Sequence, residues 1–437
     1  MQTELLIHAD WVLPVDAGDA TLAKHSLAIA DGRVAALLPR AEAEAQIEAA
    51  RTLDLPGHVL IPGLVNAHTH SPMTLLRGLA DDLPLMTWLY EHIWPAERRW
   101  VDQEFVADGT RLAVLEMLRG GVTCFSDMYF HAEVTGRVCA EAGMRVLAGM
   151  IVVDLPTRYA DSADEYLRRG LELYEHFRDH PLVRAAFAPH STYAVPEAAL
   201  ARMRTLADEL EVQVHIHLHE NRDEVLQVLR EHGERPIARL DRLGLLGPQL
   251  IAVHMTQLEP AEIARLAETG AHVVHCPESN LKLASGFCPV AELLTAGINV
   301  ALGTDGAASN NDLNLLGELR TAALLAKGVA GRANAVPAQQ ALRMSTLNGA
   351  KALGLADEIG SLEVGKAADV VAVDLGDPRT QPLYNPCSQL VYAAGSHQVR
   401  HVWVRGRQVL RDGAPLTLDP ASIIAAARAW GERIAKV

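Results

Sequence analysis

Short apolar runs and helical stretches alternate regularly through the middle of the chain, and few folds accommodate such a pattern. The apolar runs lie at 59–67, 122–127, 145–153, 182–189, 212–218, 250–254, 272–275 and 298–303. Between them lie stretches whose apolar residues recur at helical spacing, such as "EAALARMRTLADELE". Eight β/α repeats in about 300 residues predict an α/β fold, a (β/α)8 TIM barrel.

Both ends of the chain have a different pattern, with short strands separated by Asp-Gly and Pro-Gly turns. This predicts one small β-sandwich domain formed by both termini, from residues 1–57 and 359–420. The barrel domain is then expected over 58–358. The tail, residues 421–437, has apolar residues at helical spacing and predicts a C-terminal helix that packs on the surface.

Composition excludes several classes of partner. The 437 residues carry a net charge of −15 and contain no basic patch, so nucleic acid is not an expected partner. No uncharged apolar run reaches about 18 residues, and the N-terminus lacks the features of a signal peptide, so no membrane association is expected. The five cysteines include no CxxC pair, which favours a reducing, cytoplasmic location.

Polar residues follow several of the predicted strands. His68 and His70 follow the first run, His217 lies in the fifth, and Asp305 follows the eighth. Active sites of TIM barrels lie at the C-terminal ends of the strands, so these side chains should meet there. Three imidazoles and one carboxylate predict a site for one zinc ion per chain with a place left for water, whose pKa zinc lowers toward 7.

The fifth strand leaves a choice of ligand, because His215, His217 and His219 share one face. The spacing favours His217. His215 is expected deeper in the barrel as a hydrogen-bonded histidine, and His219 beyond the strand end. Glu220, at the mouth, is placed for general acid and base catalysis.

The remaining histidines allow more than one interpretation. His190 follows the fourth strand and His254 ends the sixth, so each either contacts the reaction centre or packs beside it. His275, near the end of the seventh strand, has either a site role or a structural one. His131 and His176 have no such placement and are expected at the surface.

Three features that the sequence lacks exclude particular kinds of metal site. No lysine lies in the first five strands, so a modified lysine cannot bridge two metal ions there, and one ion is favoured. "HAE" occurs at 131–133, but no PCxxC follows, which excludes deaminases of the zinc-cysteine type. "HENRD" has no second histidine, so the HExxH motif is absent as well.

Five segments in this order resemble the amidohydrolase superfamily: "PGLVNAHTH", "HIHLHE", "HCPESNLKLASG", "GTDGAASNNDLNLLGE" and "IGSLEVGKAADVVAVD". The sequence is most similar to the branch of 5′-methylthioadenosine/S-adenosylhomocysteine deaminases, with the triazine chlorohydrolases nearby, and the resemblance extends to about residue 410. It implies that the metal ligands are His68, His70, His217 and Asp305. It also implies that Glu220 moves protons to the purine ring and that His254 lies beside the attacking hydroxide.

The resemblance implies substrate contacts too. Glu97, in "IWPAE", matches the carboxylate that holds the ribose hydroxyls, although from the residues alone it would be a surface carboxylate. His190 matches a histidine near the purine N3. Arg158, in "DLPTRYA", is the candidate partner for the carboxylate of S-adenosylhomocysteine. Where relatives commonly have "HET", this chain has "HEN", which places Asn221 beside the catalytic glutamate.

These features together predict zinc-dependent hydrolytic deamination of an adenine nucleoside to its inosine analogue and ammonia. The small-molecule substrates expected first are 5′-methylthioadenosine and adenosine, with S-adenosylhomocysteine ranked lower. The alternatives are a guanine- or pterin-type deaminase or a triazine chlorohydrolase, whose substrates lack ribose. A non-catalytic barrel is a third hypothesis, against which the complete ligand set argues. A homo-oligomer is expected.

Overall fold

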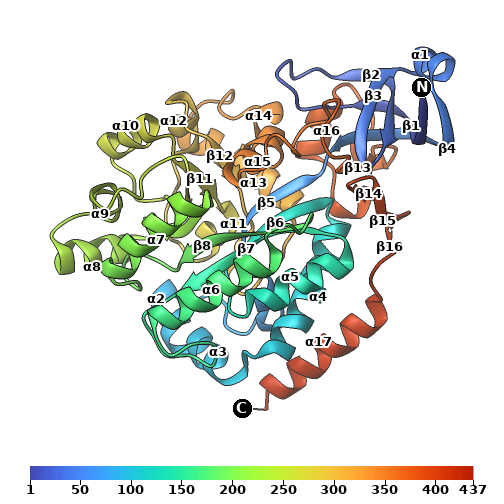
Figure 1. Cartoon of the computed structure of the whole chain (residues 1–437). Coiled ribbons are helices and arrows are strands. Elements are labelled where there is room, and N and C mark those ends of the chain that lie inside the picture. The colour runs from blue at the N-terminus through green and yellow to red at the C-terminus, as the bar shows by residue number, and fades with distance from the viewer. Residues whose placement is uncertain (437) are drawn as a thin grey trace.

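The computed structural model describes residues 1–436, which are organised around two eight-stranded sheets (Figure 1). The strands of the first sheet are β5 (Leu64–Thr69), β6 (Val122–Asp127), β7 (Arg145–Val152), β8 (Val183–Pro189), β9 (Val214–Leu218), β10 (Leu250–His254), β11 (His272–His275) and β12 (Val300–Leu302). They pair in parallel in chain order. Just beyond β12, the backbone N–H of Asp305 donates to the carbonyl of His68 (3.1 Å) and closes the ring. The predicted TIM barrel is therefore confirmed.

Helices cover the outside of this barrel (Figure 1). The principal ones are α4 (Gln103–Arg119), α5 (Ala132–Ala142), α6 (Ala163–Phe177), α7 (Glu197–Leu210), α8 (Arg222–His232), α10 (Pro260–Thr269), α12 (Val290–Thr295) and α13 (Leu315–Ala330). These helices are amphipathic, with apolar residues on the side that faces the barrel. In α6, for example, Leu167, Leu173 and Phe177 are buried while the charged residues between them face outward.

The second sheet uses both ends of the chain, as expected for the terminal β domain. Its order is β16-β15-β14-β13-β4-β1-β2-β3, and β1 and β4 pair in parallel while the other pairs are antiparallel. The strands are β1 (Gln2–Val12), β2 (Leu22–Ala30), β3 (Arg33–Pro39), β4 (Glu48–Pro62), β13 (Val370–Asp374), β14 (Val399–Val404), β15 (Arg407–Arg411) and β16 (Ala414–Pro415). Ile7, Leu27, Val370 and Trp403 share one buried cluster, so strands from the two termini enclose a common core.

The apolar run 59–67, predicted as one strand, is divided between the two sheets. β4 continues in the terminal sheet to Pro62, and β5 starts the barrel at Leu64. A Cβ on Gly63 would lie 2.0 Å from Oγ1 of Thr123, so only glycine fits at this crossing. The prediction was wrong because the end of β4 and all of β5 are buried on both faces, and periodicity cannot separate two such runs.

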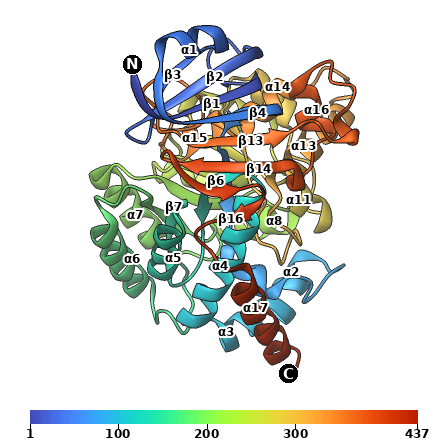
Figure 2. The ribbon, with the colours of Figure 1, turned by 90° about the vertical axis from the view of Figure 1, so that its right-hand side faces the viewer.

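Two contacts tie the outer parts of the chain to the barrel. At the start of β7, the guanidinium of Arg145 donates to both carboxylate oxygens of Asp369, from the terminal domain (2.8 and 3.2 Å). At the other end of the molecule, α17 (Pro420–Ile434) packs Trp430 edge-on against Phe105 of α4, with ring centroids 5.2 Å apart. Figure 2 shows α17 beside α4, far from the N-terminus.

The five cysteines are all free and buried, and burial raises the pKa of the Cys124 thiol to about 12, so that it remains protonated. No helix within residues 1–436 combines the length and apolar character needed to cross a membrane.

Candidate metal centre and substrate cavity

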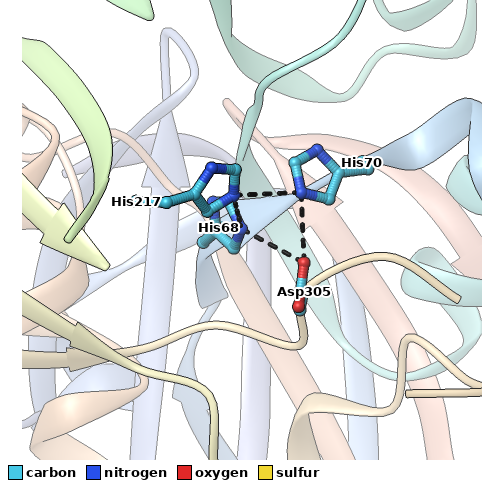
Figure 3. A group of neighbouring side chains, drawn as sticks. All are labelled: His68, His70, His217 and Asp305. Atoms are coloured by element: carbon cyan, nitrogen blue, oxygen red, sulfur yellow. Dashed lines mark hydrogen bonds and ion pairs between the residues drawn. The ribbon is translucent and has the colours of Figure 1, made fainter. Parts of the chain in front are cut away.

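Four polar side chains converge at the C-terminal end of the barrel (Figure 3). Nε2 of His217 lies 3.3 Å from Nε2 of both His68 and His70. Oδ1 of Asp305 lies 3.2 Å from Nε2 of His68 and 3.1 Å from Nε2 of His70. The four ligand atoms all lie within 4.8 Å of one another, so the ligand set expected from the sequence is brought together.

This arrangement fits zinc. Ligands about 2.0–2.1 Å from a tetrahedral ion are about 3.3 Å apart, and four of the six ligand pairs have separations of 3.1–3.3 Å. Three imidazole nitrogens and one carboxylate oxygen are also the donor types that zinc prefers. The four residues can therefore hold one divalent ion.

Neighbouring groups orient the histidine ligands. The ring of His70 donates through Nδ1 to the carbonyl of Met128 (2.6 Å), and the ring of His217 donates through Nδ1 to the carbonyl of His190 (2.8 Å). A carbonyl can only accept, so Nδ1 of each ring carries a proton and Nε2 is the nitrogen that faces the centre and can bind a metal ion. His215 lies deeper in the barrel, where its Nε2 is 2.9 Å from Nδ1 of His68.

Asp305 is held from several sides. Its Oδ2 accepts from the hydroxyls of Ser279 (2.7 Å) and Ser309 (2.8 Å), and its Oδ1 accepts from the backbone N–H of Gly306 (2.8 Å). Its φ is 63°, a conformation that non-glycine residues adopt rarely and mostly where the surroundings impose it. Neither Ser279 nor Ser309 was expected to have a role, although both lie in the segments that resemble the family.

The protonation of the histidines bears on metal affinity. Burial lowers the pKa of His68 to about 3 and lowers the pKa of His217 well below its ordinary value, so both are neutral, as metal ligands must be. Burial also acts to lower the pKa of His70, but Asp305 outweighs it and raises that pKa to about 9. A bound metal ion must displace this proton.

Glu220 lies just past β9, at the edge of the metal centre. Burial, aided by the nearby Asp305 carboxylate, raises its pKa to about 8. Its Oε2 is 4.0 Å from Nε2 of His254, whose Nδ1 donates to Oδ1 of Asn280 (2.9 Å). A carboxyl with a pKa near neutrality can both take up and release a proton, which suits general acid and base catalysis.

The backbone that carries Glu220 is fixed by a second buried acid, Glu224 of α8. Its carboxylate accepts from the backbone N–H of Glu220 (2.6 Å) and of His219 (3.2 Å). Asn221 caps the same helix, since its side chain accepts from the backbone N–H of Glu224 (2.8 Å). Threonine is also a favoured N-cap residue, so "HEN" and "HET" can serve the same structural purpose here.

A cavity opens beside the metal centre, and its wall includes Glu97, Arg158, His190, Glu220 and His254. Glu97 belongs to α3 (Trp94–Trp100) and is half-buried, not a surface carboxylate. Burial raises its pKa to about 7, although the Tyr129 hydroxyl and His70 favour its ionised form. The cavity thus has one carboxyl beside the metal ligands and a second on another element of its wall.

His190 and Arg158 contribute differently to the wall. Burial lowers the pKa of His190 to about 4, and its buried Nδ1 has no hydrogen-bond partner within residues 1–436. The ring is neutral and forms part of the cavity wall. Arg158 has a side chain that is 49% exposed, and it is already engaged by the carbonyl of Arg99 (3.1 Å) and by Asp102 (3.6 Å).

Several wall residues were not anticipated from the sequence. Trp88, Leu89 and Ile93 come from a π-helical turn, η2 (Trp88–Ile93), and Arg98 follows on α3. Turns of this type occur often at functional sites, but nothing in the sequence marks this one. The "MTWLYEHIWP" segment has apolar residues of the kind that also build ordinary cores, so its role depends on the fold.

The other histidines lie outside the cavity wall. His131 was expected at the surface, which is wrong: it is 7% exposed, and its ring packs on Tyr159 with centroids 4.8 Å apart. The segment before it forms part of the cavity wall, so the chain is buried there. His176 is exposed as expected, His275 is buried at the end of β11, and His219 bridges to the carbonyl of Gln257 (3.1 Å).

Comparison with known proteins agrees with this geometry. A model of the amidohydrolase family matches residues 59–409. A 5-methylthioadenosine/S-adenosylhomocysteine deaminase of Teredinibacter turnerae is 49% identical over 98% of this chain and 97% of its own length. The crystal structure of an adenosine deaminase from Xanthomonas campestris with bound zinc is 53% identical, with a TM-score of 0.99 over 100% of this chain and 99% of that one. A zinc complex of an atrazine chlorohydrolase from Arthrobacter aurescens has a TM-score of 0.92 over 98% of this chain and 99% of that one, but at 24% identity it shows the fold alone.

Proposed function

This chain belongs to the amidohydrolase family and is an enzyme of the hydrolase class, and we propose that it deaminates adenine nucleosides. The reaction replaces the 6-amino group by oxygen and releases ammonia. 5′-Methylthioadenosine and adenosine are the preferred substrates, and S-adenosylhomocysteine is a poorer one. The names of the relatives at 46–49% identity support this class of substrate.

The observation that carries the proposal is the position of Glu220. Its carboxyl is buried beside the four ligands, with a pKa raised to about 8 by burial. Deamination needs a group that takes a proton from water and delivers it to the ring and then to the departing amine. Glu220 has the location and the proton affinity for both transfers.

Metal binding, proton transfer and positioning of the water are assigned to different residues of the chain. A zinc ion bound by His68, His70, His217 and Asp305 supplies Lewis acidity and makes water nucleophilic at neutral pH. Glu220 accepts a proton from the attacking water and donates it to N1 of adenine, which prepares C6 for attack. Glu220 then takes the second proton, from the hydroxyl now on C6, and passes it to the amino group, so that C6 becomes a carbonyl and the amine leaves as ammonia. His254, held by Asn280 (2.9 Å), faces Glu220 and positions the water.

The substrate side of the cavity supports a nucleoside in preference to a free base. Glu97, half-buried on the wall, can accept hydrogen bonds from the two ribose hydroxyls. His190 is neutral and lines the cavity, so a ring N–H of His190 can donate to the purine N3. These two contacts hold the base with its C6 toward the metal centre.

The cavity offers fewer contacts for the zwitterionic tail of S-adenosylhomocysteine. Its carboxylate would need a cation, and Arg158 is half-exposed and already shared between Arg99 and Asp102. Apolar residues such as Trp88 and Ile93 line the same cavity and suit a methylthio group. This is why we rank 5′-methylthioadenosine first.

The test compares kcat/KM for five compounds on one preparation, from the loss of absorbance of the adenine chromophore. The compounds are 5′-methylthioadenosine, adenosine, S-adenosylhomocysteine, adenine and 2′,3′-dideoxyadenosine. We expect the first two to react best and the last two to be much poorer, because buried polar groups would be left unpaired. Free adenine as good as the nucleosides would refute the role of Glu97, and S-adenosylhomocysteine tenfold better than 5′-methylthioadenosine would reverse the ranking.

A further inference from the structure

A second cavity lies at the seam between the barrel and the terminal sheet, near the N-terminal ends of β7 and β8. Five arginines line it: Arg33, Arg145, Arg178, Arg184 and Arg405. We call it the arginine groove. The metal ligands lie at the opposite, C-terminal ends of the strands, so binding in this groove is independent of the proposed reaction.

The groove carries an excess of positive charge. Against its five guanidinium groups, which stay protonated at any physiological pH, its wall contains only the carboxylates of Asp179 and Glu358, and Asp369 lies beneath it on Arg145. The chain as a whole has a net charge of −15. A cationic hollow on such an anionic chain is a local feature that overall composition does not account for.

Internal pairing leaves part of this charge available. Arg145 is buried and fixed on Asp369 (2.8 Å), Arg184 pairs with Glu358, and Arg178 pairs with Glu175 (2.9 Å). Arg33 and Arg405 are exposed, and neither forms an ion pair with any of residues 1–436. Arg33 donates one N–H to the carbonyl of Gly365 (2.7 Å), which orients its guanidinium without neutralising it.

The backbone holds these two unpaired arginines at one place. Arg33 follows the turn between β2 and β3, and Arg405 lies in the turn between β14 and β15. The turns are in direct contact: a Cβ on Gly32 would lie 2.7 Å from the carbonyl oxygen of Arg405, and a Cβ on Gly406 would lie 2.9 Å from Cα of Gly32. With φ of 72° at Gly32, only glycine allows this approach without strain.

We propose that the arginine groove binds a phosphate group, either as free phosphate or as the phosphoryl group of a small ester. The planar guanidinium fork matches phosphate oxygens in pairs, and several such forks around one hollow are the usual recognition of this anion. Arg145, Arg178 and Arg184 come from the barrel, whereas Arg33 and Arg405 come from the terminal sheet. A bound phosphate therefore bridges the two domains and stabilises the seam.

The direct test is calorimetric titration of the zinc-loaded enzyme with inorganic phosphate at constant ionic strength. The informative variant is R33Q/R405Q, which removes the two unpaired charges and leaves the ion pairs at the seam intact. The matched control is R137Q/R320Q, which removes the same charge from two exposed arginines that have no ion pair in the described chain. We expect saturable binding to the wild type and the control, and binding weakened at least about tenfold in R33Q/R405Q.

Thermal unfolding with and without phosphate gives a second readout. Ligands that bind only the folded state raise the unfolding midpoint, so phosphate should raise it in the wild type and in R137Q/R320Q but not in R33Q/R405Q. Unchanged kcat of R33Q/R405Q on adenosine shows that this variant is folded. Should it fail to fold, the single variants R33Q and R405Q, each of which removes one unpaired charge, replace it.

Ribose 5-phosphate distinguishes the two sources of the anion. Binding of both ligands, lost together in R33Q/R405Q, supports recognition of a phosphoryl group, and binding of phosphate alone supports a site for the free anion. The proposal is overturned if the wild type shows no saturable binding of phosphate up to concentrations on the order of 10 mM. It is equally overturned if R33Q/R405Q binds phosphate as tightly as the control.

Discussion

The two sides of the catalytic cavity are built in different ways. The metal ligands come from the ends of barrel strands or the residue just beyond them, and each is fixed by a hydrogen bond to a neighbouring strand or loop. Most of the substrate side comes from the π-helical turn η2, helix α3 and the loop that contains Arg158, whereas His190 directly follows a barrel strand. Strand ends place atoms reproducibly, whereas loops and helix turns can vary. In the proposed function, reaction chemistry therefore depends on strand ends, and substrate choice depends mainly on loops and helix turns.

Glu220 and Glu97 illustrate the same contrast. Burial raises the pKa of both carboxyls, to about 8 and about 7. Glu220 has its backbone fixed by Glu224 and faces His254, while Glu97 lies near Tyr129. We propose different purposes for these similar side chains, proton transfer for Glu220 and substrate contact for Glu97. Substitutions on the two sides should then differ in kind as well as in size.

The largest effect is expected at the metal centre. H217A removes one of four ligands, so the ion should be lost and kcat should fall at least about 10⁴-fold, because Lewis acid catalysis contributes several kcal/mol. Elemental analysis and kcat on the same sample check this. H176A, at an exposed histidine, is the control and should keep both metal and activity. A zinc-loaded, active H217A would remove His217 from the ligand set.

Next in size is the proton shuttle. E220Q keeps the shape of the side chain but cannot pass on a proton, so kcat should fall about 10²–10⁴-fold while zinc content stays at the wild-type level. Steady-state kinetics and metal analysis together separate this from a ligand loss. A near-normal kcat would show that another group carries the proton.

On the substrate side, E97Q should act selectively. A hydrogen bond to a charged group contributes about 1.5–3 kcal/mol, so kcat/KM for adenosine should fall about 10- to 100-fold. The value for 2′,3′-dideoxyadenosine, which lacks both hydroxyls, should change less than about threefold. An equal loss on the two substrates would mean that Glu97 supports the fold of the cavity and does not contact ribose.

The smallest effect is expected at Arg158. Its half-exposed side chain already pairs with Asp102 at 3.6 Å, and exposed ion pairs contribute about 0–1 kcal/mol. R158Q should therefore lower kcat/KM for S-adenosylhomocysteine by no more than about threefold and leave 5′-methylthioadenosine unaffected. A tenfold loss restricted to S-adenosylhomocysteine would identify Arg158 as its carboxylate partner and weaken the proposed ranking.

The features that could be predicted from the sequence are those that follow from the spacing of apolar residues and from the position of a residue at a strand end. The alternation of strand and helix predicted the barrel, and residues at strand ends such as His68 and Asp305 had to meet, because parallel strands end on one side. Prediction from the sequence failed where two buried strands adjoin, since the run 59–67 crosses from β4 to β5 with no change in apolar character. It also failed at His131, which is buried by the surrounding fold.

The substrate side was less predictable for a physical reason. The position of Glu97 depends on η2 and α3, whose placement over the cavity follows from tertiary packing and not from periodicity. Only the resemblance to a known family suggested that this carboxylate faces the substrate. Ser279 and Ser309 orient Asp305 through their hydroxyls. No sequence pattern distinguishes a serine in this role from a serine in an ordinary turn.

The central claim, a deaminase with one metal ion, is tested most directly by two stoichiometries measured on one preparation of the wild-type protein. Elemental analysis gives the metal per chain, and an ammonia assay gives the ammonia released per 5′-methylthioadenosine consumed. The account predicts one zinc ion per chain and one ammonia per nucleoside, with loss of the adenine chromophore. Two tightly bound ions per chain, or consumption of the nucleoside without ammonia, would contradict it.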